Sequence, residues 1–514
     1  MSRTRRFLGG VGFGYVSLVL ATVVGLWLTP FLLHRIGSYE YGLWLITTQL
    51  LGYLMLLDLG VVALAPRETA YAMGMASQGG ADDVGPTFAR FRRIVKWQLA
   101  PTAVASVLAW WLVGNRWPEL RVPLAIILGA FVAAFPLRLY HATLQGLQDL
   151  PFLGKAQLAA YIAGTLTTVG FVIAGVGLPA LAAGWVVTQA VSAAACAWRL
   201  AVSFTPVWRA TADAPSLADA RVLFGRSGWV SLSQVGQVFL NGSDLLVLGG
   251  ILGPAATVPY ACTGKLITVL ANHPQLLMQA AAPAIAEMRA SAQRAHLARV
   301  SVALMRAMLI LSGAVACLVA AANQSFVEWW VGPNQFAGMT LTVLLLASML
   351  ARHFATTLGY SLFSFGYERR LALTSIADGI VAVVVTAALA WWTGLGVLSA
   401  AIGSLAGVTL VSIPASGLAL ARELQITVPT LILSLRIWAL RFAAALVLSV
   451  IFSRVIGVNG LGGLIAIAMS VAVIYGIIMW PLLMEPPLSP YVRAALVPVA
   501  RMFGVRQEAV EPRA

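Results

Sequence analysis

Long blocks of hydrophobic residues, separated by short polar breaks, run along the whole chain. A block of about 20 such residues crosses the roughly 30 Å hydrocarbon core of a bilayer when it is helical. This pattern predicts fourteen membrane-spanning helices, at residues 11–33, 41–65, 95–114, 121–144, 156–175, 178–198, 227–250, 256–282, 300–322, 338–365, 371–393, 395–420, 437–456 and 460–484. Of the 514 residues 60% are hydrophobic and 10% are charged, whereas a soluble domain carries about 25% charged residues. The predicted class is therefore an all-α integral membrane protein.

Basic residues fall almost entirely on alternate connections between the predicted spans. Of the 33 lysines and arginines, 26 lie on the connections that include both termini. Only Arg35, Arg116, Arg121 and Arg454 lie on the opposite side. Because cytoplasmic loops carry the excess of Lys and Arg, both termini are predicted to be cytoplasmic. A nucleic-acid surface would need a basic patch or stripe, so this scatter in short loops predicts no nucleic-acid partner.

A short repeat indicates two related halves. The segment GYVSL at 14–18 recurs as GWVSL at 228–232, and Ile36-Gly37 recurs as Leu252-Gly253, at offsets of 214 and 216 residues. Six predicted spans separate the copies, so both halves enter the membrane in the same direction. Transporters built from repeated halves bind substrate where the halves meet. We therefore expect two parallel six-helix lobes around a central cavity, followed by two further helices.

These helices divide the chain into predicted regions. They are an N-terminal lobe at 1–200, a cytoplasmic linker at 201–226, a C-terminal lobe at 227–422, two added spans at 423–485 and a cytoplasmic tail at 486–514. The tail is either a basic amphipathic segment on the inner leaflet or a disordered end. The outer loops are short, and the longest covers 323–338, so no extramembrane domain is expected.

Two motifs carry a resemblance to a known family. RIGSYEYGLW at 35–44, followed by LLDLGVVALAPR at 56–67, is similar to the opening hairpin of bacterial polysaccharide-repeat (Wzx-like) flippases. DLLVLGGILGPAATVPYACTGKL at 244–266 resembles the start of their second lobe. Their superfamily also holds the multidrug and toxic-compound exporters and the lipid II flippase. The resemblance implies a V-shaped hydrophilic cavity, alternating access and a location in the bacterial inner membrane.

The resemblance also implies a substrate, an undecaprenyl-pyrophosphate-linked oligosaccharide that moves from the cytoplasmic to the periplasmic leaflet. Charges inside the spans are the candidates for contacting it, because a charge at the centre of a membrane helix costs about 2.5–3.5 kcal/mol and commonly has a function. Arg352, Lys265 and Arg138 are predicted to meet the phosphates and acidic sugars in turn. Asn272 and His273 lie in a polar stretch interrupted by proline, a feature that often lines transporter sites. For His273 a satisfied helix kink is the alternative.

The acidic residues inside the spans have two interpretations. Asp58–Arg138 and Asp244–Lys265 are predicted as ion pairs that hold helices together within a lobe, because each pair falls at a similar estimated depth. Asp58 is alternatively a cation site used for coupling. Asp378 is the acidic residue nearest to Arg352 in the sequence, but lies at a shallower estimated depth. Arg352 is therefore the charge for which a purely structural role is least expected.

No ATP-binding motif is evident, and no cofactor is expected. The three cysteines, Cys196, Cys262 and Cys317, lie in hydrophobic segments without metal-like spacing, so no metal site is predicted. Coupling to H⁺ or Na⁺ and the membrane potential alone are the open energy sources. A pyrophosphate with about two negative charges gains roughly 4.6 kcal/mol per 100 mV on leaving a negative interior.

Several functions compete with this interpretation. An ion-coupled multidrug exporter would favour an acidic or aromatic cavity, whereas the charges within these spans are mainly basic; a lipid II flippase would use the same pyrophosphate chemistry. A membrane glycosyltransferase or polymerase is the distant alternative, but such enzymes need a sizeable outer loop, so no enzymatic activity is expected. A polysaccharide polymerase, glycosyltransferases and membrane lipids are the partners that the resemblance implies. The residues do not distinguish O-antigen, exopolysaccharide and capsule repeat units as the substrate.

Overall fold

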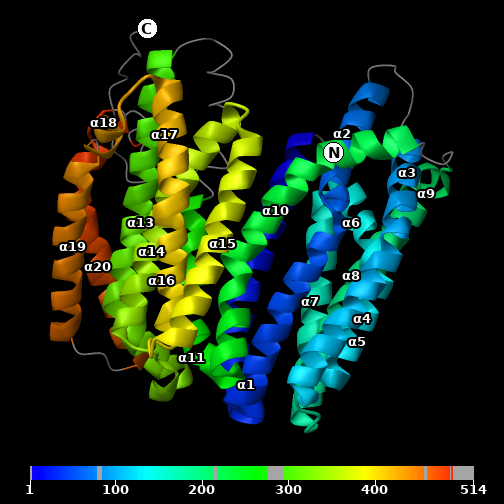
Figure 1. Cartoon of the computed structure of the whole chain (residues 1–514), viewed down its shortest axis with the longest axis horizontal. Coiled ribbons are helices and arrows are strands. Elements are labelled where there is room, and N and C mark those ends of the chain that lie inside the picture. Colours follow the sequence, from blue (N-terminus) through cyan, green and yellow to red (C-terminus); the bar gives the residue numbers. More distant parts are fainter. Residues whose placement is uncertain are drawn as a thin grey trace. The chain divides into compact units, whose positions relative to one another are not determined.

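A computed structural model describes residues 3–77, 84–211, 217–275, 294–433, 435–456 and 460–486, with 488, 489 and 492. Every regular element in these residues is a helix, and they contain no strand (Figure 1). The predicted all-α class is therefore confirmed. The polar network around Asp58 described below lies where several of these helices begin or end.

The helices form two compact units. The first unit contains Met1–Ala261 and Ser375–Ala400, and the second contains Cys262–Thr374 and Ala401–Ala514. Helix α10, which opens the predicted second lobe, belongs to the first unit. The lobe limits predicted from the sequence stay a prediction.

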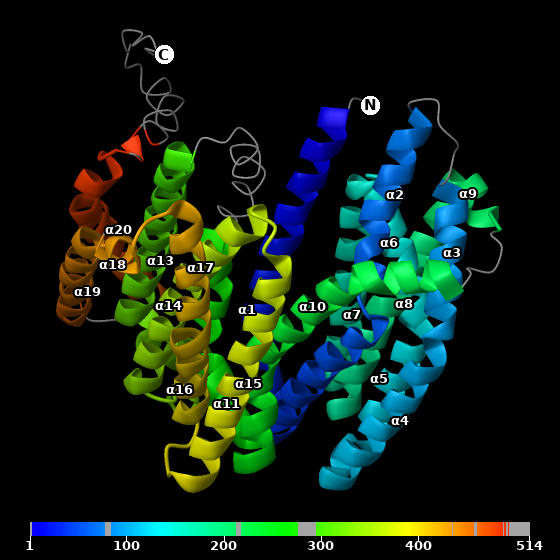
Figure 2. The same ribbon diagram turned by 45° about the horizontal axis from the view of Figure 1, so that its top comes forward.

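The first unit is built on one large hydrophobic core, in which Phe88, Leu124 and Phe135 are fully buried. Helices α7 and α8 lie side by side along most of their length in both ribbon views (Figure 2). Its elements are α1 (Arg3–Leu54), η1 (Met55–Asp58), α2 (Val61–Ser77), α3 (Val84–Trp97), α4 (Leu99–Arg116), η2 (Pro118–Leu120), α5 (Arg121–Ala134), η3 (Phe135–Leu137), α6 (Arg138–Gly146), α7 (Leu150–Ile173), α8 (Leu178–Ser203), α9 (Thr205–Arg209), α10 (Leu217–Leu252), most of α11 (Pro254–Thr263) and most of α15 (Glu368–Trp392).

The second unit has smaller cores around α13, one of which joins that helix to α19 and α20. Tyr475 of α20 donates a hydrogen bond to the Ile310 carbonyl of α13 over 2.5 Å. The elements of this unit are α13 (Arg294–Val331), η4 (Pro333–Gln335), α14 (Met339–Ser364), most of α16 (Leu398–Gly407), the π-helical turn η5 (Val408–Ser412), α17 (Ile413–Leu424), α18 (Val428–Leu433), α19 (Arg436–Ile456) and α20 (Gly460–Leu483).

Ten helical segments in the described part of the chain are long and apolar enough to cross a membrane, or eleven if the bent pair Gln234–Leu240 and Ser243–Leu252 forms one span. One segment, Val19–Asp58, overlaps two of the predicted spans, 11–33 and 41–65, and Gly37 between them has non-helical angles (φ 81°, ψ 168°). The predicted span 256–282 continues past residue 275, beyond the described residues. A multi-pass membrane protein is confirmed, while the count of fourteen stays a prediction.

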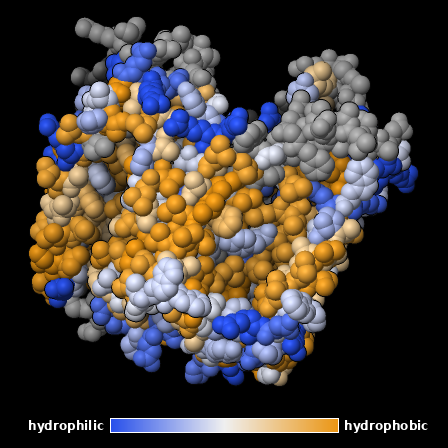
Figure 3. Space-filling view, viewed as in Figure 1, coloured by the Kyte–Doolittle hydropathy of each residue, from blue (hydrophilic) through white to orange (hydrophobic). Residues whose placement is uncertain are grey.

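Helix α20 shows why these segments suit a bilayer. Its exposed residues recur every fourth position, whereas the opposite face is buried against the rest of the second unit. The exposed residues at this spacing are Leu461, Ile465, Met469, Val473 and Ile477, and the buried ones are Ile467, Val471, Tyr475, Met479 and Leu482. Figure 3 shows hydrophobic residues over helix flanks in the same way, with hydrophilic residues gathered toward helix ends. Because both faces of α20 are apolar, the exposed face fits lipid tails rather than water.

The glycines Gly37 and Gly253 occupy equivalent places in the two copies of the repeat, 216 residues apart. Both have a positive φ, 81° and 94°, a conformation that favours glycine. In each copy a helix therefore breaks at this glycine and a second helix follows. Helix α1 also packs closely on the second copy, because a side chain at Gly42 would meet the backbone carbonyl of Pro254.

Candidate substrate-binding site

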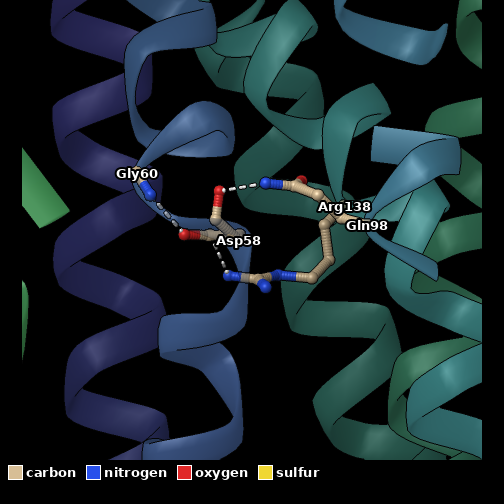
Figure 4. A network of polar contacts seen from close by, with 4 residues as sticks. All are labelled: Asp58, Gly60, Gln98 and Arg138. Carbon is tan, nitrogen blue, oxygen red and sulfur yellow. Dashed lines mark hydrogen bonds and ion pairs between the residues drawn. The ribbon is translucent and has the colours of Figure 1, made fainter. Parts of the chain in front are cut away.

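Asp58 lies at the end of η1, where the chain turns before α2. Its carboxylate Oδ1 accepts a hydrogen bond from the Gly60 N–H over 2.8 Å, and Leu59 between them is left-handed with φ 48° (Figure 4). An aspartate that bonds to the backbone two residues later is a common turn device. Gly60, with φ 71°, completes the turn and allows α2 to begin at Val61.

Arg138 and Gln98 bring two further parts of the first unit to Asp58. Arg138 Nη2, at the first residue of α6, donates to Asp58 Oδ2 over 3.0 Å. Gln98 Nε2, between α3 and α4, donates to the Asp58 carbonyl over 2.8 Å. The Arg138 guanidinium also lies over the Phe135 ring, 5.6 Å from its centroid. The ion pair expected between Asp58 and Arg138 is therefore present.

The burial of Asp58 makes this pair necessary. The Asp58 side chain is 4% exposed and that of Arg138 is 27% exposed. Burying an isolated charge costs several kcal/mol, so the carboxylate requires the guanidinium and the turn N–H as partners. This geometry supports the interpretation of Asp58 as a structural partner within the first unit.

Asp244 of α10 binds a tyrosine of the next helix. Its Oδ2 accepts a hydrogen bond from Tyr260 Oη over 2.6 Å, which joins α10 to α11. The preceding residue, Ser243, meets Tyr53 of α1 with an oxygen-to-oxygen distance of 2.7 Å. The ion pair between Asp244 and Lys265 stays a prediction, because the two residues belong to different units.

Arg352 is held from α14 by a polar contact with α16. Its Nε and Nη2 donate to Ser404 Oγ over 3.1 Å and 2.9 Å, and Nη2 also donates to the Ser404 carbonyl over 3.2 Å. Ser348, one turn before Arg352, meets the same hydroxyl at 2.9 Å. These contacts with Ser404 orient the half-buried guanidinium.

The remaining predicted residues lie on other elements of the chain. Lys265 is half-buried just after α11, and Asn272 and His273 are exposed on the helical segment 265–275. Asn272 Nδ2 donates to the Thr268 carbonyl of its own segment over 3.4 Å. Asp378 is buried on the part of α15 that belongs to the first unit. The structure thus joins Asp58 to Arg138, and gives Arg352 and Asn272 separate partners.

Several buried polar residues that the sequence analysis did not select form hydrogen bonds between helices. His353 Nδ1 lies 2.6 Å from Ser312 Oγ. Asn323 Nδ2 donates to the Thr263 carbonyl over 2.9 Å and to Thr342 Oγ1 over 3.0 Å. All of these residues are buried. A search for every polar side chain within a predicted span, instead of charges alone, would have found all of them except Asn323, which follows the predicted span 300–322.

The described residues contain no group of three or more His, Cys, Asp or Glu side chains placed to hold a metal ion. Cys196, Cys262 and Cys317 are buried and free.

Comparison with solved structures identifies the fold. The inward-closed conformation of the lipid II flippase MurJ has a TM-score of 0.58 at 11% identity, covering 92% of this chain and 100% of that one. The inward-facing conformation of a multidrug resistance MATE family transporter of the MOP superfamily has a TM-score of 0.54 at 14% identity, covering 79% and 95%. An outward-facing MATE transporter has a TM-score of 0.53 at 14% identity, covering 83% and 98%. The chain therefore has the helical membrane-transporter fold of this superfamily.

A family model narrows this class. Residues 99–335 match the model described as polysaccharide biosynthesis protein. No curated protein matches the sequence. The matched range runs from the start of α4 to the end of η4 and includes Arg138 and Lys265.

Proposed function

We propose that the protein is a flippase that moves an undecaprenyl-pyrophosphate-linked oligosaccharide from the cytoplasmic to the periplasmic leaflet of the bacterial inner membrane. Both termini are cytoplasmic in this proposal, as the distribution of basic residues favours. The substrate crosses by alternating access, and no covalent bond forms or breaks. A polysaccharide polymerase and glycosyltransferases are the expected functional partners.

The choice of an anionic substrate rests on one observation, the hydrogen bonds that hold the Arg352 guanidinium to Ser404. The guanidinium lies along a helix with membrane-spanning length, and the Ser404 oxygen atoms fix its direction. A fixed guanidinium is well suited to phosphate oxygens, which it binds through two parallel N–H groups. At about 4 Å and an effective dielectric constant near 20, one such charge pair is worth roughly 4 kcal/mol before desolvation.

The family match supports a role in polysaccharide biosynthesis, and the solved structures support the movement of a lipid-linked substrate. The family match refers to polysaccharide biosynthesis, and the fold is shared with a lipid II flippase. Multidrug transporters share the fold as well, but a carrier of organic cations would gain nothing from Arg352 and Lys265. Lipid II carries the same pyrophosphate linkage, so the sugar is the part that an assay must vary.

The test is translocation in vesicles that contain the purified protein and a lipid-linked oligosaccharide. We expect Arg352→Ala to lower the rate of translocation at least about tenfold, because it removes a charge pair with the pyrophosphate. Arg352→Lys should have an intermediate rate, since it keeps the charge but loses the forked contact with Ser404. Arg454→Ala is the matched control, because Arg454 is exposed near the end of α19.

The outcomes separate the candidate functions. A rate in Arg352→Ala equal to that of the wild type, at equal protein abundance, would remove Arg352 from the mechanism. Translocation of lipid II at a rate equal to that of oligosaccharide lipids would favour the lipid II alternative. Wild-type transport of organic cations, without lipid translocation, would show that the protein is a multidrug exporter.

A further inference from the structure

Helix α3 has a hydrophobic face inside the first unit and a basic face on its surface. The hydrophobic face contributes to the large core of that unit through Phe88, Phe91, Ile94 and Val95. The basic face carries Arg90, Arg93 and Lys96, of which Arg90 and Lys96 are exposed and Arg93 is half-buried. Residues three or four positions apart lie on the same side of a helix, so Arg90, Arg93 and Trp97 follow one line along α3. Burial of the opposite face holds these cations at the surface.

Helix α4 continues the line of α3, as both ribbon views show (Figures 1 and 2). Backbone bonds of the helical type cross the junction, because the Gln98 N–H donates to the Ile94 carbonyl over 3.2 Å and the Thr102 N–H donates to the Gln98 carbonyl over 3.1 Å. Trp97, at the end of α3, is exposed. Beyond it, the large exposed side chains of α4 are all hydrophobic up to the last turn, namely Val104, Val107, Leu108, Trp110, Trp111 and Leu112. The surface of this helix therefore passes from cations, through a tryptophan, to hydrophobic residues.

This order of side chains matches the order of layers at the surface of a bilayer. Tryptophan is enriched where the headgroups meet the hydrocarbon, and exposed hydrophobic side chains beyond it fit lipid tails. From Arg90 to Lys96 the helix rises about 9 Å. With Trp97 at the interface, these cations therefore lie at the level of the lipid phosphates.

Helix α9 adds a further cation to this surface. Arg92 of α3 donates from Nη1 to the Trp208 carbonyl and from Nη2 to the Ala210 carbonyl, both over 3.5 Å. Its guanidinium also lies over the Phe88 ring, 5.6 Å from the centroid. Arg92 thus fastens the end of α9 to α3. Arg209, between the two residues whose carbonyls Arg92 contacts, is exposed.

The elements around α3 carry few carboxylates that could neutralise these cations. The described residues of α2, α4, α6, α9 and η3, which pack on α3, contain one carboxylate, that of Glu68, and its neighbour in the sequence is Arg67. Asp82 and Asp83, which precede α3 in the sequence, lie outside the described residues. We call Arg90, Arg93, Lys96 and Arg209 the α3 basic surface. Within the described residues, these four side chains form no ion pair.

We propose that the α3 basic surface binds the headgroup of an anionic phospholipid, whose acyl chains lie along α4 beyond Trp97. Arginine binds phosphate oxygens through parallel N–H groups, and lysine adds a point charge. The site requires a net negative lipid, because a zwitterionic headgroup offsets its phosphate with a cation of its own. In the orientation proposed above, the lipid belongs to the cytoplasmic leaflet. The inference is independent of the substrate that the protein carries.

The test is lipid binding to the purified full-length protein in detergent, followed by native mass spectrometry. Phosphatidylglycerol and phosphatidylcholine with identical acyl chains are the two probes. We expect the wild type to prefer phosphatidylglycerol at least about tenfold, since each basic residue at an anionic membrane surface is worth about fivefold in affinity. The triple variant Arg90→Gln, Arg93→Gln, Lys96→Gln should bind the two lipids almost equally. Raising the salt concentration should lower the wild-type preference, because ions screen exposed charges.

Two further variants keep the test informative. The triple variant Arg422→Gln, Arg436→Gln, Arg454→Gln is the matched control, because it removes the same charge from exposed residues of the second unit. It should keep the wild-type preference. Lys96→Gln alone changes one exposed side chain, so it tests the site even where the α3 triple variant fails to fold. We expect it to lower the preference by about fivefold.

Three results would overturn the inference. They are a wild type that binds both lipids equally, an unchanged preference in Lys96→Gln and the α3 triple variant, and an equal loss of preference in the control triple variant. A polyglutamate peptide tests an acidic protein segment as the occupant instead. Binding of this peptide by the wild type, with no preference between the two lipids, would assign the α3 basic surface to such a partner and overturn the lipid site.

Discussion

At the residue scale, the structure gives different partners to Arg138 and Arg352, two arginines that lie within predicted spans. Arg138 is paired with the buried carboxylate of Asp58, while Arg352 is oriented by the neutral oxygen atoms of Ser404. A paired charge has its field largely cancelled, so Arg138 attracts an anion less strongly than it would without Asp58. These contacts assign Arg138 mainly to structure and leave Arg352 as the stronger candidate for substrate.

The Asp58–Arg138 pair leads to a prediction about stability. Replacing Arg138 with alanine leaves the Asp58 carboxylate buried without its cation, so we expect a loss of about 3–5 kcal/mol in the free energy of unfolding. The double variant Asp58→Asn, Arg138→Met should lose less, because no buried charge remains. Thermal unfolding in detergent and abundance in the membrane measure both effects. If the double variant were no more stable than Arg138→Ala, the pair would not explain the cost.

Estimated depth predicted the Asp58–Arg138 pair, which the structure confirms, but residue type and depth did not predict every polar partner. Asp58 and Arg138 are 80 residues apart, and their contact depends on how η1 and α6 pack. The Asp244–Tyr260 hydrogen bond shows the same dependence, because a tyrosine on the next helix is the partner of Asp244 there. Depth estimates place residues along the membrane normal, but they carry no information on the direction in which a side chain points around its helix.

At the element scale, glycines decide how closely the helices of the first unit approach. A side chain at Gly42 of α1 would meet the Pro254 carbonyl, and one at Gly249 of α10 would meet the Ile46 side chain. Both contacts join the opening helix of the chain to the hairpin formed by α10 and α11. Glycine therefore permits a backbone approach that alanine would prevent.

This close approach can be tested with two glycines of the same helix. Gly42→Ala should lower the free energy of unfolding by about 1–3 kcal/mol, because a backbone carbonyl cannot move aside. Gly52→Ala should be neutral or stabilise by up to about 1 kcal/mol, since a side chain there has open space and alanine favours the helix. The change in melting temperature of each variant in detergent measures the difference. Equal effects at the two sites would show that the Gly42 contact is unimportant for stability.

The positions of the helices agree with the hydrophobic pattern, and their breaks do not follow from it. The described helices overlap every predicted span, but α1 continues from the first predicted span into the second, with Gly37 as its non-helical residue. Hydropathy averages over many residues, so it locates an apolar block without locating a single change of backbone direction. The turn at Asp58 to Gly60 is hidden within a predicted span for the same reason.

At the scale of the whole molecule, the proposed reaction is the movement of negative charge across a membrane. A substrate with about two negative charges gains roughly 4.6 kcal/mol per 100 mV when it leaves a negative interior. We therefore expect translocation in vesicles to speed up when the cytoplasmic side of the protein is made negative, and to slow when the potential is reversed. A potassium diffusion potential of known sign provides the measurement. A rate indifferent to the imposed potential would mean that no net charge crosses in the rate-limiting step.

The sequence by itself determined that this is a helical multi-pass membrane protein with mainly basic charges inside its spans. Those properties follow from composition and from the length of apolar blocks, which depend on neighbours along the chain. Tertiary structure confirmed the Asp58–Arg138 pair that estimated depth predicted, and it alone decided that Gln98 binds Asp58, that Ser404 orients Arg352 and that Ser312 meets His353. These contacts join residues 40 to 80 positions apart, so they depend on helix packing and rotation, which no local pattern encodes.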